Sequence, residues 1–399
     1  MKKHILALIA LTLTAMLLCT GCQTNNEQFV SVDAIEPTAI YDWMDGESPV
    51  SPQRTGLFRS GLTMVDHEVT SAGVYFICDD FILYSDDDSD SIVKLCGRPD
   101  CTHDNEDCNA YIEDGCQISY YSGYLYAVTG DGSEEACKLI RMNLDGSNRV
   151  EILDLLGFAD ENGGDFVACN MVVNGTLLFS TYGWVEQDDG SLNGTWLKYY
   201  TYQLDGSAGK PKAVESSGWI NYNCGDVNLT YLTETKNGGM YGSFWNWDME
   251  ADTLTYLCDH PGSPGYFSEE EGYYYRDGAV RCLNYETQEE QILIETGLSG
   301  DYYALCLPDC LVVVSRDTSA EGADQNLYIY NWEYSLVEQI ELTYEKTDTL
   351  RLEHTIIADT AERIILTNTL QGLPMYYIEK SEFGSGKVVV RPFNLPDFS

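Results

Sequence analysis

The feature that most constrains the fold of this chain is a unit that recurs along most of its 399 residues. Each unit holds a short apolar or aromatic run, a turn rich in Gly, Asp, Asn or Ser, and in most copies a second apolar run. Runs of this length between turn residues are typical of paired β-strands. Seven units are visible, at residues 81–95, 139–153, 200–207, 244–257, 280–294, 327–342 and 375–390.

A second hairpin precedes most of these units. Its copies lie at residues 118–128, 171–180, 229–243, 266–275 and 302–314. Several of them turn on Asn-Gly or Ser-Gly, and residues that tolerate positive φ angles favour tight hairpins. Two hairpins in each unit predict four antiparallel strands per unit.

The spacing of the units predicts how the strands assemble. Matching positions recur at a mean interval of about 49 residues, and four-stranded propeller blades span about 40 to 50 residues. We therefore predict an all-β fold, a β-propeller of seven blades, with six or eight as the other counts. A pair of β-sandwiches is the alternative architecture. Helical periodicity is absent except at Val150–Leu156, and the 29 tyrosines favour strands.

The N-terminus carries a separate pattern. Lys2-Lys3 precedes the apolar stretch Ile5–Leu18, and small residues precede Cys22. This order is typical of a secretion signal. The apolar stretch is shorter than the roughly 20 residues that span a bilayer, which argues against the alternative of a transmembrane anchor. The segment resembles the bacterial lipobox, although Cys19 stands where that motif usually has a branched apolar residue.

The resemblance to a lipobox implies a location and a domain order. It implies that residues 1–21 are a signal peptide that is removed, and that Cys22 then carries palmitate or a similar lipid. The protein would sit on the outer, extracytoplasmic face of the cell membrane. Residues 22–60 are polar and interrupted by proline, which predicts a tether. The propeller is expected over residues 61–399.

The charge of the chain excludes some partners. It has 64 acidic and 22 basic residues, a net charge of −42. A surface that binds phosphate needs clustered Lys and Arg, and the sequence shows no such cluster. We expect no nucleic acid partner, membrane contact through the lipid alone, and a monomer.

Three cysteines and a histidine lie close together after the first unit: Cys96, Cys101, His103 and Cys108. Three thiolates and an imidazole are a ligand set that zinc accepts in tetrahedral geometry. The alternatives are free thiols or disulfides, such as Cys96–Cys101 or Cys108–Cys116, which an exported protein favours. In each case the segment is interpreted as structural, and no cofactor other than such a zinc ion is expected.

Other cysteines have simpler interpretations. Cys306 and Cys310 would face each other across a tight hairpin, which predicts a disulfide between them. The rest lie mostly in strand-like runs and are interpreted as small buried apolar residues: Cys78, Cys137, Cys169, Cys224, Cys258 and Cys282.

Two segments resemble known propellers. The turn Asn143–Ser147 and its copy at Asp205-Gly206 resemble a turn of TolB-like propellers. The segment Leu95–Tyr111 resembles one shared by propeller lipoproteins of anaerobic Gram-positive gut bacteria, a family without an assigned activity. The resemblance covers the whole chain and implies the propeller fold, but it brings no catalytic residues.

The sequence offers no catalytic set. It has no G-x-S-x-G motif for a nucleophilic hydrolase, and its many acids single out no pair for glycoside hydrolysis. We therefore predict a lipid-anchored binding or scaffolding module for a protein, peptide or glycan. The alternative is an extracellular carbohydrate-active enzyme with paired carboxylates in the propeller channel. A helix-rich solute-binding lipoprotein conflicts with the lack of helical periodicity.

Overall fold

The structure is a computed structural model that describes residues 66–396 with gaps. The predicted signal peptide, Cys22 and the tether lie outside the described residues. The gaps are residues 79, 131–136, 165, 174, 187–191, 208, 215–219, 225–226, 237–238, 260–262, 269, 299–301, 308, 316–324, 343–353 and 369–374.

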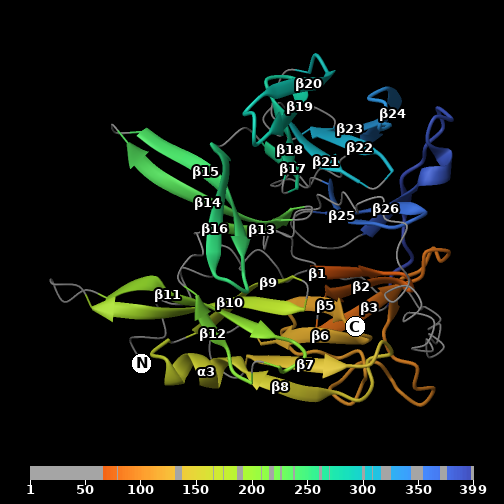
Figure 1. Ribbon diagram of the computed structural model, residues 1–399. Coiled ribbons are helices and arrows are strands. Elements are labelled where there is room, and N and C mark those ends of the chain that lie inside the picture. The colour runs from red at the N-terminus through yellow and green to blue at the C-terminus, as the bar shows by residue number, and fades with distance from the viewer. Residues whose placement is uncertain are drawn as a thin grey trace.

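The described strands form seven four-stranded antiparallel sheets, numbered here in chain order (Figure 1). Sheet 1 contains β1 (Asp66–Thr70), β2 (Gly73–Cys78), β3 (Phe81–Ser85) and β4 (Val93–Lys94), and sheet 2 contains β5 (Gln117–Tyr121), β6 (Tyr124–Thr129), β7 (Lys138–Met142) and β8 (Val150–Asp154). Sheet 3 contains β9 (Phe166–Val173), β10 (Thr176–Glu186), β11 (Leu192–Gln203) and β12 (Lys212–Val214), and sheet 4 contains β13 (Ile220–Cys224), β14 (Val227–Lys236), β15 (Gly239–Asp248) and β16 (Thr253–Asp259). Sheet 5 contains β17 (Ser263–Phe267), β18 (Glu271–Arg276), β19 (Ala279–Asn284) and β20 (Glu290–Glu295), and sheet 6 contains β21 (Tyr302–Cys306), β22 (Leu311–Ser315), β23 (Gln325–Tyr330) and β24 (Leu336–Leu342). Sheet 7 contains β25 (His354–Asp359), β26 (Arg363–Asn368), β27 (Met375–Glu379) and β28 (Arg391–Pro392).

Neighbouring sheets meet through their first strands. Contacts join β1 to β5, β5 to β9, β9 to β13, β13 to β17 and β17 to β21, and β25 contacts β1. Sheets 6 and 7 share an apolar core that includes Val312, Ile329 and Ile364. The last sheet therefore lies beside the first, as the blue and orange ribbons of Figure 1 show.

Polar contacts strengthen the junction of sheet 7 with sheet 1. After β28, the N–H of Asn394 donates to the carbonyl of Asp90 (2.9 Å), and the N–H of Ile92 donates to the carbonyl of Asn394 (2.9 Å). The guanidinium of Arg363, on β26, donates to the carbonyl of Ser89 in the β3–β4 turn. The end of the described chain is thus paired with its first sheet.

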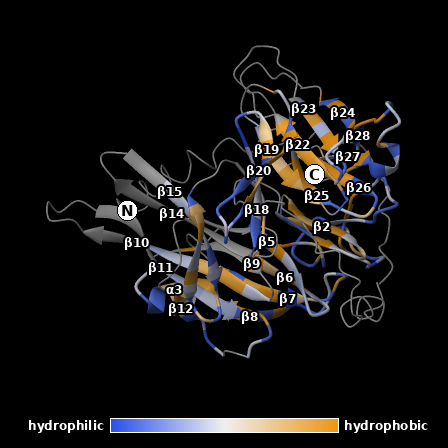
Figure 2. Ribbon diagram, turned by 45° about the horizontal axis from the view of Figure 1, so that its top comes forward, coloured by the Kyte–Doolittle hydropathy of each residue, from blue (hydrophilic) through white to orange (hydrophobic). Residues whose placement is uncertain are grey.

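Burial follows the position of a strand within its sheet. Every residue of β2 and of β3 is buried, because strands inside a sheet are covered on both faces. The fourth strands are more open, and Val150, Tyr256, Ile292 and Leu336 on four of them are exposed. Figure 2 shows the hydrophobic residues concentrated in the strands.

The all-β class and the four strands per unit are confirmed, but some elements differ from the prediction. The hairpin expected first in its unit at 229–243 is β14 with β15, and an unpredicted strand, β13, precedes it. The last strand was expected at 387–390 and is β28 instead. The chain turns at 383–386, where Gly384 and Gly386 have positive φ angles, before it reaches sheet 7.

The helical signal at 150–156 was placed too early. β8 occupies residues 150–154, and α3 (Leu155–Glu161) follows. Asp154 ends the strand and caps the helix, since its side chain accepts the N–H of Gly157 at 2.8 Å. In the part of the chain that the structure describes, no helix is long and apolar enough to cross a membrane.

Candidate metal centre

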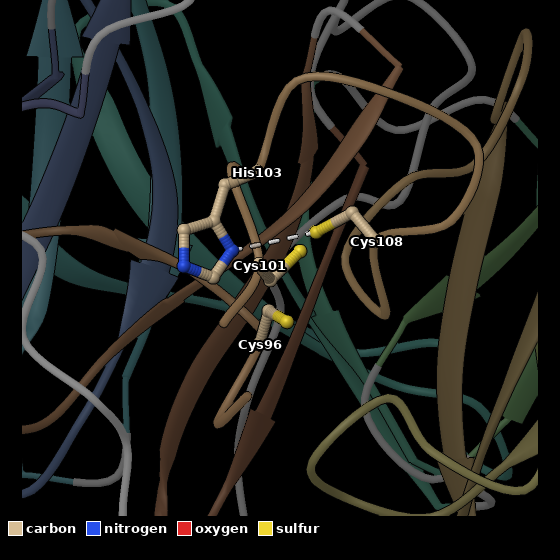
Figure 3. A group of neighbouring side chains, drawn as sticks. All are labelled: Cys96, Cys101, His103 and Cys108. Carbon is tan, nitrogen blue, oxygen red and sulfur yellow. Dashed lines mark hydrogen bonds between the residues drawn. The ribbon is translucent and has the colours of Figure 1, made fainter. Parts of the chain in front are cut away.

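The four residues singled out by their spacing come together in the structure. Each of Cys96, Cys101, His103 and Cys108 offers one ligand atom, and these atoms all lie within 4.8 Å of one another. Figure 3 shows the three sulfur atoms and the imidazole turned toward a common centre. Cys101 is half-buried and the other three are buried.

The cluster lies in the loop of residues 96–109, which follows β4, the fourth strand of sheet 1. β4 pairs with β3, and the N–H of Leu95 donates to the carbonyl of Ile82 (2.9 Å). The N–H of Ile82 donates in turn to the carbonyl of Ala110 (2.7 Å), and Tyr111 pairs with Phe81. The two residues that flank this loop, Leu95 and Ala110, therefore both hydrogen-bond to Ile82 of β3.

The loop of residues 96–109 has acidic side chains on its outer surface. Asp100, Asp104, Glu106 and Asp107 are exposed. Short turns fold the chain back, for example where the N–H of Cys108 donates to the carbonyl of Asn105 (2.9 Å). A small loop whose ends meet and whose interior is filled by its own side chains resembles an Ω-loop.

The second sheet covers this loop through the turn between β7 and β8. Gly146 has a φ of +76°, and a Cβ there would lie 2.5 Å from the carbonyl oxygen of Asn109 and 3.0 Å from that of Leu95. Only a residue without a Cβ fits so close to two backbone oxygens. The turn predicted from its Asp-Gly-Ser sequence thus has a second role, as a support for the loop.

Two of the four donors, Cys108 and His103, favour their neutral forms when no cation is near. The Sγ of Cys108 lies 3.5 Å from Nδ1 of His103, and the N–H of Ala110 donates to the same sulfur at 3.3 Å. Burial raises the pKa of Cys108 to about 12. Burial, with help from the charges of Lys94 and Arg98, lowers the pKa of His103, which favours the neutral imidazole that binds metals.

This chemistry fits a bound dication better than a nucleophile. A reactive cysteine needs an accessible thiolate, whereas Cys108 is buried with a raised pKa. A dication reverses that preference, since a coordinating thiol loses its proton to the metal site. Three sulfurs and one nitrogen complete a tetrahedral shell and leave no position for substrate, as in structural zinc sites.

The alternative disulfides are not formed in the structure. Cys96, Cys101, Cys108 and Cys116 are all thiols, and Cys116 is exposed, outside the cluster. The structure therefore brings the four residues together as a possible metal site, whereas the identity of the metal stays a prediction.

The second pair of cysteines lies at the turn between β21 and β22. Cys306 and Cys310 are both buried, and the N–H of Leu307 donates to the carbonyl of Cys310 (2.8 Å). Burial, followed by the nearby charge of Asp309, raises the pKa of Cys310. These two described cysteines are not joined by a disulfide here, and the expected pairing stays a prediction.

The cysteines interpreted as small apolar residues mostly lie in the core. Cys78, Cys137 and Cys258 are buried, and Cys282 is half-buried. The side chains of the remaining two, in β9 and β13, lie outside the described ones.

Sequence reasoning missed two cations beside the cluster, Lys94 and Arg149. Lys94 interrupts the apolar run Ile92–Leu95, and a charge within an apolar run was the available signal. Arg149 had no comparable signal, because it approaches the loop from the neighbouring sheet.

Known proteins resemble this chain in fold but hardly in sequence. No family model matches the chain, and no curated protein matches it. Solved structures similar to it include TolB from Acinetobacter baumannii, with 15% identity, a TM-score of 0.36, and coverage of 76% of this chain and 67% of that one. They also include the tricorn protease (10%, TM-score 0.46, 86% and 36%) and an oligogalacturonate lyase in complex with manganese (10%, TM-score 0.37, 65% and 73%). Similarity this low carries no argument about activity, substrate or site residues.

Proposed function

We propose that this chain is a lipid-anchored, extracytoplasmic β-propeller of seven blades that serves as a binding or scaffolding module. We further propose that Cys96, Cys101, His103 and Cys108 hold a structural zinc ion. The observation that carries the proposal is the closed set of four donors inside a loop that begins and ends at one residue of β3. A site of this kind stabilises a fold and has no open position for chemistry.

The zinc ion would act on the fold through the loop. Binding a metal to four residues of one short segment fixes that segment, and its binding free energy becomes folding free energy. Here the fixed segment connects sheet 1 to sheet 2 along the chain and packs against the turn at Gly146. Zinc would thereby hold the first two sheets in one relative position.

The seven-blade count rests on the succession of sheets. Seven four-stranded sheets follow one another in the described residues, the first strands of sheets 1 to 6 contact in sequence order, and sheets 6 and 7 share an apolar core. Contacts of β25 with β1 and of Asn394 with Asp90 bring the last sheet to the first. A radial arrangement of this kind leaves only short strand edges exposed.

The location and the kind of partner are supported by the sequence. The lipobox-like segment ending at Cys22 supports a lipid anchor on the outer face, and a myristate-sized chain alone would hold only weakly, so more than one acyl chain is expected. The net charge of −42 supports a protein, peptide or glycan partner over nucleic acid.

The metal assignment is tested on the full chain purified in detergent under reducing conditions. Elemental analysis should find one zinc per chain, released when the thiols are modified. Cys96→Ser and Cys108→Ser should lose the metal, whereas Cys137→Ser, at a buried cysteine outside the cluster, should keep it. A protein that takes up no zinc on reconstitution, or a disulfide between two cluster cysteines found by mass spectrometry in protein alkylated before any reductant is added, rejects the zinc centre.

The anchor and the binding role are tested separately. Cys22→Ala should abolish incorporation of labelled palmitate and release the protein from membranes. An unchanged membrane fraction in that variant rejects the lipid anchor. Glycan and peptide arrays probed with the detergent-solubilised chain test the binding role, and turnover of an oligosaccharide on the array would favour the enzyme.

A further inference from the structure

A buried lysine lies beside the candidate metal centre. Lys94 ends β4 and is only 4% exposed. Its Nζ donates to the carbonyl of His103 (2.8 Å) and lies 3.8 Å from the centre of the Phe81 ring. An ammonium group is buried at a considerable cost unless negative charge lies near it, and Lys94 places its ammonium group against the backbone of one residue of the cluster.

An arginine reaches the same loop from sheet 2. The guanidinium of Arg149 donates to the carbonyls of Asn109 and Tyr111 at the end of the loop, and to that of Gly146 (3.3 Å). Although Arg149 as a whole is exposed, this end of the side chain is surrounded by loop carbonyls.

The metal-bound state has a charge that these cations match. A dication with three thiolates and one neutral imidazole carries one net negative charge. The outer surface of the loop is already acidic, with Asp100, Asp104, Glu106 and Asp107 exposed. Adding a negative centre beneath these carboxylates is unfavourable unless positive charge lies close to it.

We infer that Lys94 and Arg149 are positioning residues of the metal centre, which neutralise its negative charge and fix the loop backbone that carries its ligands. This inference rests on the proposed zinc site. Lys94 donates a hydrogen bond to the backbone carbonyl of His103, and Arg149 donates to the carbonyl of Asn109, directly after Cys108. Groups that support metal ligands in this way typically change metal affinity by about 10- to 100-fold when they are removed.

Lys94→Met separates charge from packing. Methionine has nearly the length of the lysine stem and fills an apolar site well. The variant also loses the hydrogen bond to the carbonyl of His103, so its metal-free stability is measured beside that of the metal-free parent. The zinc-bound variant should lose affinity, because the negative centre has lost its nearest buried cation.

The experiment compares zinc affinities of full-length variants by competition with a chromophoric chelator at constant pH and ionic strength. Lys94→Met and Arg149→Met should each bind one zinc about 10- to 100-fold more weakly than the parent. Cobalt substitution should show unchanged sulfur-to-cobalt absorption at saturation, which shows that the ligand set is intact. Lys138→Met is the matched control, because it removes an exposed cation of sheet 2 whose partner is Glu151 (2.8 Å).

The outcomes separate this inference from the proposed function. If the parent binds no zinc, the zinc site itself is wrong. If the parent binds zinc and both variants bind it as tightly as Lys138→Met does, the site stands and the role of the two cations is wrong. Arg149 lies at the surface, so its variant gives a result even if Lys94→Met does not fold.

Discussion

Asp359 is a buried acid for which two opposing effects on the pKa can be told apart. It ends β25, is 8% exposed, and its Oδ1 lies 2.8 Å from Nζ of Lys380. Burial disfavours the charged carboxylate and raises its pKa, while Lys380 favours the carboxylate and lowers it. Burial is the larger effect, and the pKa of Asp359 rises from its ordinary value of 3.8 to about 7.

The raised pKa fixes the sign of the pH dependence. The folded state binds the proton of Asp359 more tightly than the unfolded state does, so this residue favours folding most when it is protonated. Its contribution is complete below the unfolded pKa and is lost as the pH rises through about 7. Between pH 5 and pH 8 the loss amounts to about 2.5 kcal/mol of unfolding free energy, from 1.36 kcal/mol per pKa unit.

The substitution Asp359→Asn removes the titration and nearly keeps the shape. We expect the unfolding free energy of this variant, relative to the parent, to rise by about 2.5 kcal/mol between pH 5 and pH 8. Denaturant unfolding at constant ionic strength measures the difference. The series begins at pH 5 because the pI of the sequence, about 4.1, lowers solubility below that.

A second variant serves as the control for Asp359→Asn, and one result would contradict the raised pKa. Asp309→Asn is the matched control, because it removes a carboxylate that contacts the same Lys380 (3.1 Å) but is 51% exposed, so that solvent screens its charge. A difference between Asp359→Asn and the parent that stays constant across this range would falsify the raised pKa. A constant difference is also what a pKa lowered by Lys380 would give, because Asp359 would then be ionised in both states throughout this range.

Three further predictions concern other described residues. Gly146→Ala should destabilise the fold by about 1 to 2 kcal/mol more than Gly206→Ala in denaturant unfolding, because both glycines have positive φ but only Gly146 faces backbone oxygens; equal costs would contradict the close packing of the loop. Arg363→Met should cost about 3 to 5 kcal/mol, since it breaks a mostly buried ion pair and the contact to sheet 1; a cost under 1 kcal/mol would refute a structural role for this junction. In timed alkylation read by mass spectrometry, exposed Cys116 should react before Cys258, because burial raises the pKa of Cys258 to about 12; the opposite order would contradict these assigned burials.

Strands in the middle of most sheets were largely predictable. Segments such as Phe81–Ser85 and Leu327–Tyr330 are short apolar runs bounded by turns, and their local pattern is enough to identify them. The first strands were harder. β13 reads Ile-Asn-Tyr-Asn-Cys and β1 reads Asp-His-Glu-Val-Thr, without a clean alternation. These strands contact the first strands of neighbouring sheets, so their surroundings come from segments far along the chain.

The candidate metal centre was likewise only partly predictable from the sequence. The spacing of Cys96, Cys101, His103 and Cys108 was enough to select them, because ligands of one site often lie in one short segment. The spacing left zinc, disulfides and free thiols open. The structure brings the four donors within 4.8 Å of one another and shows no disulfide among them.

The sequence alone determined the class of the fold, the unit of four strands and the members of the cluster. Each of these depends on side-chain order within a few neighbouring residues, which the chain fixes locally. Only the tertiary structure decided that Ile82 closes the loop, that Gly146 packs against it, and that Lys94 and Arg149 flank the cluster. Those contacts join separate strands or sheets, and packing between sheets depends on shape and charge across distances that no local pattern encodes.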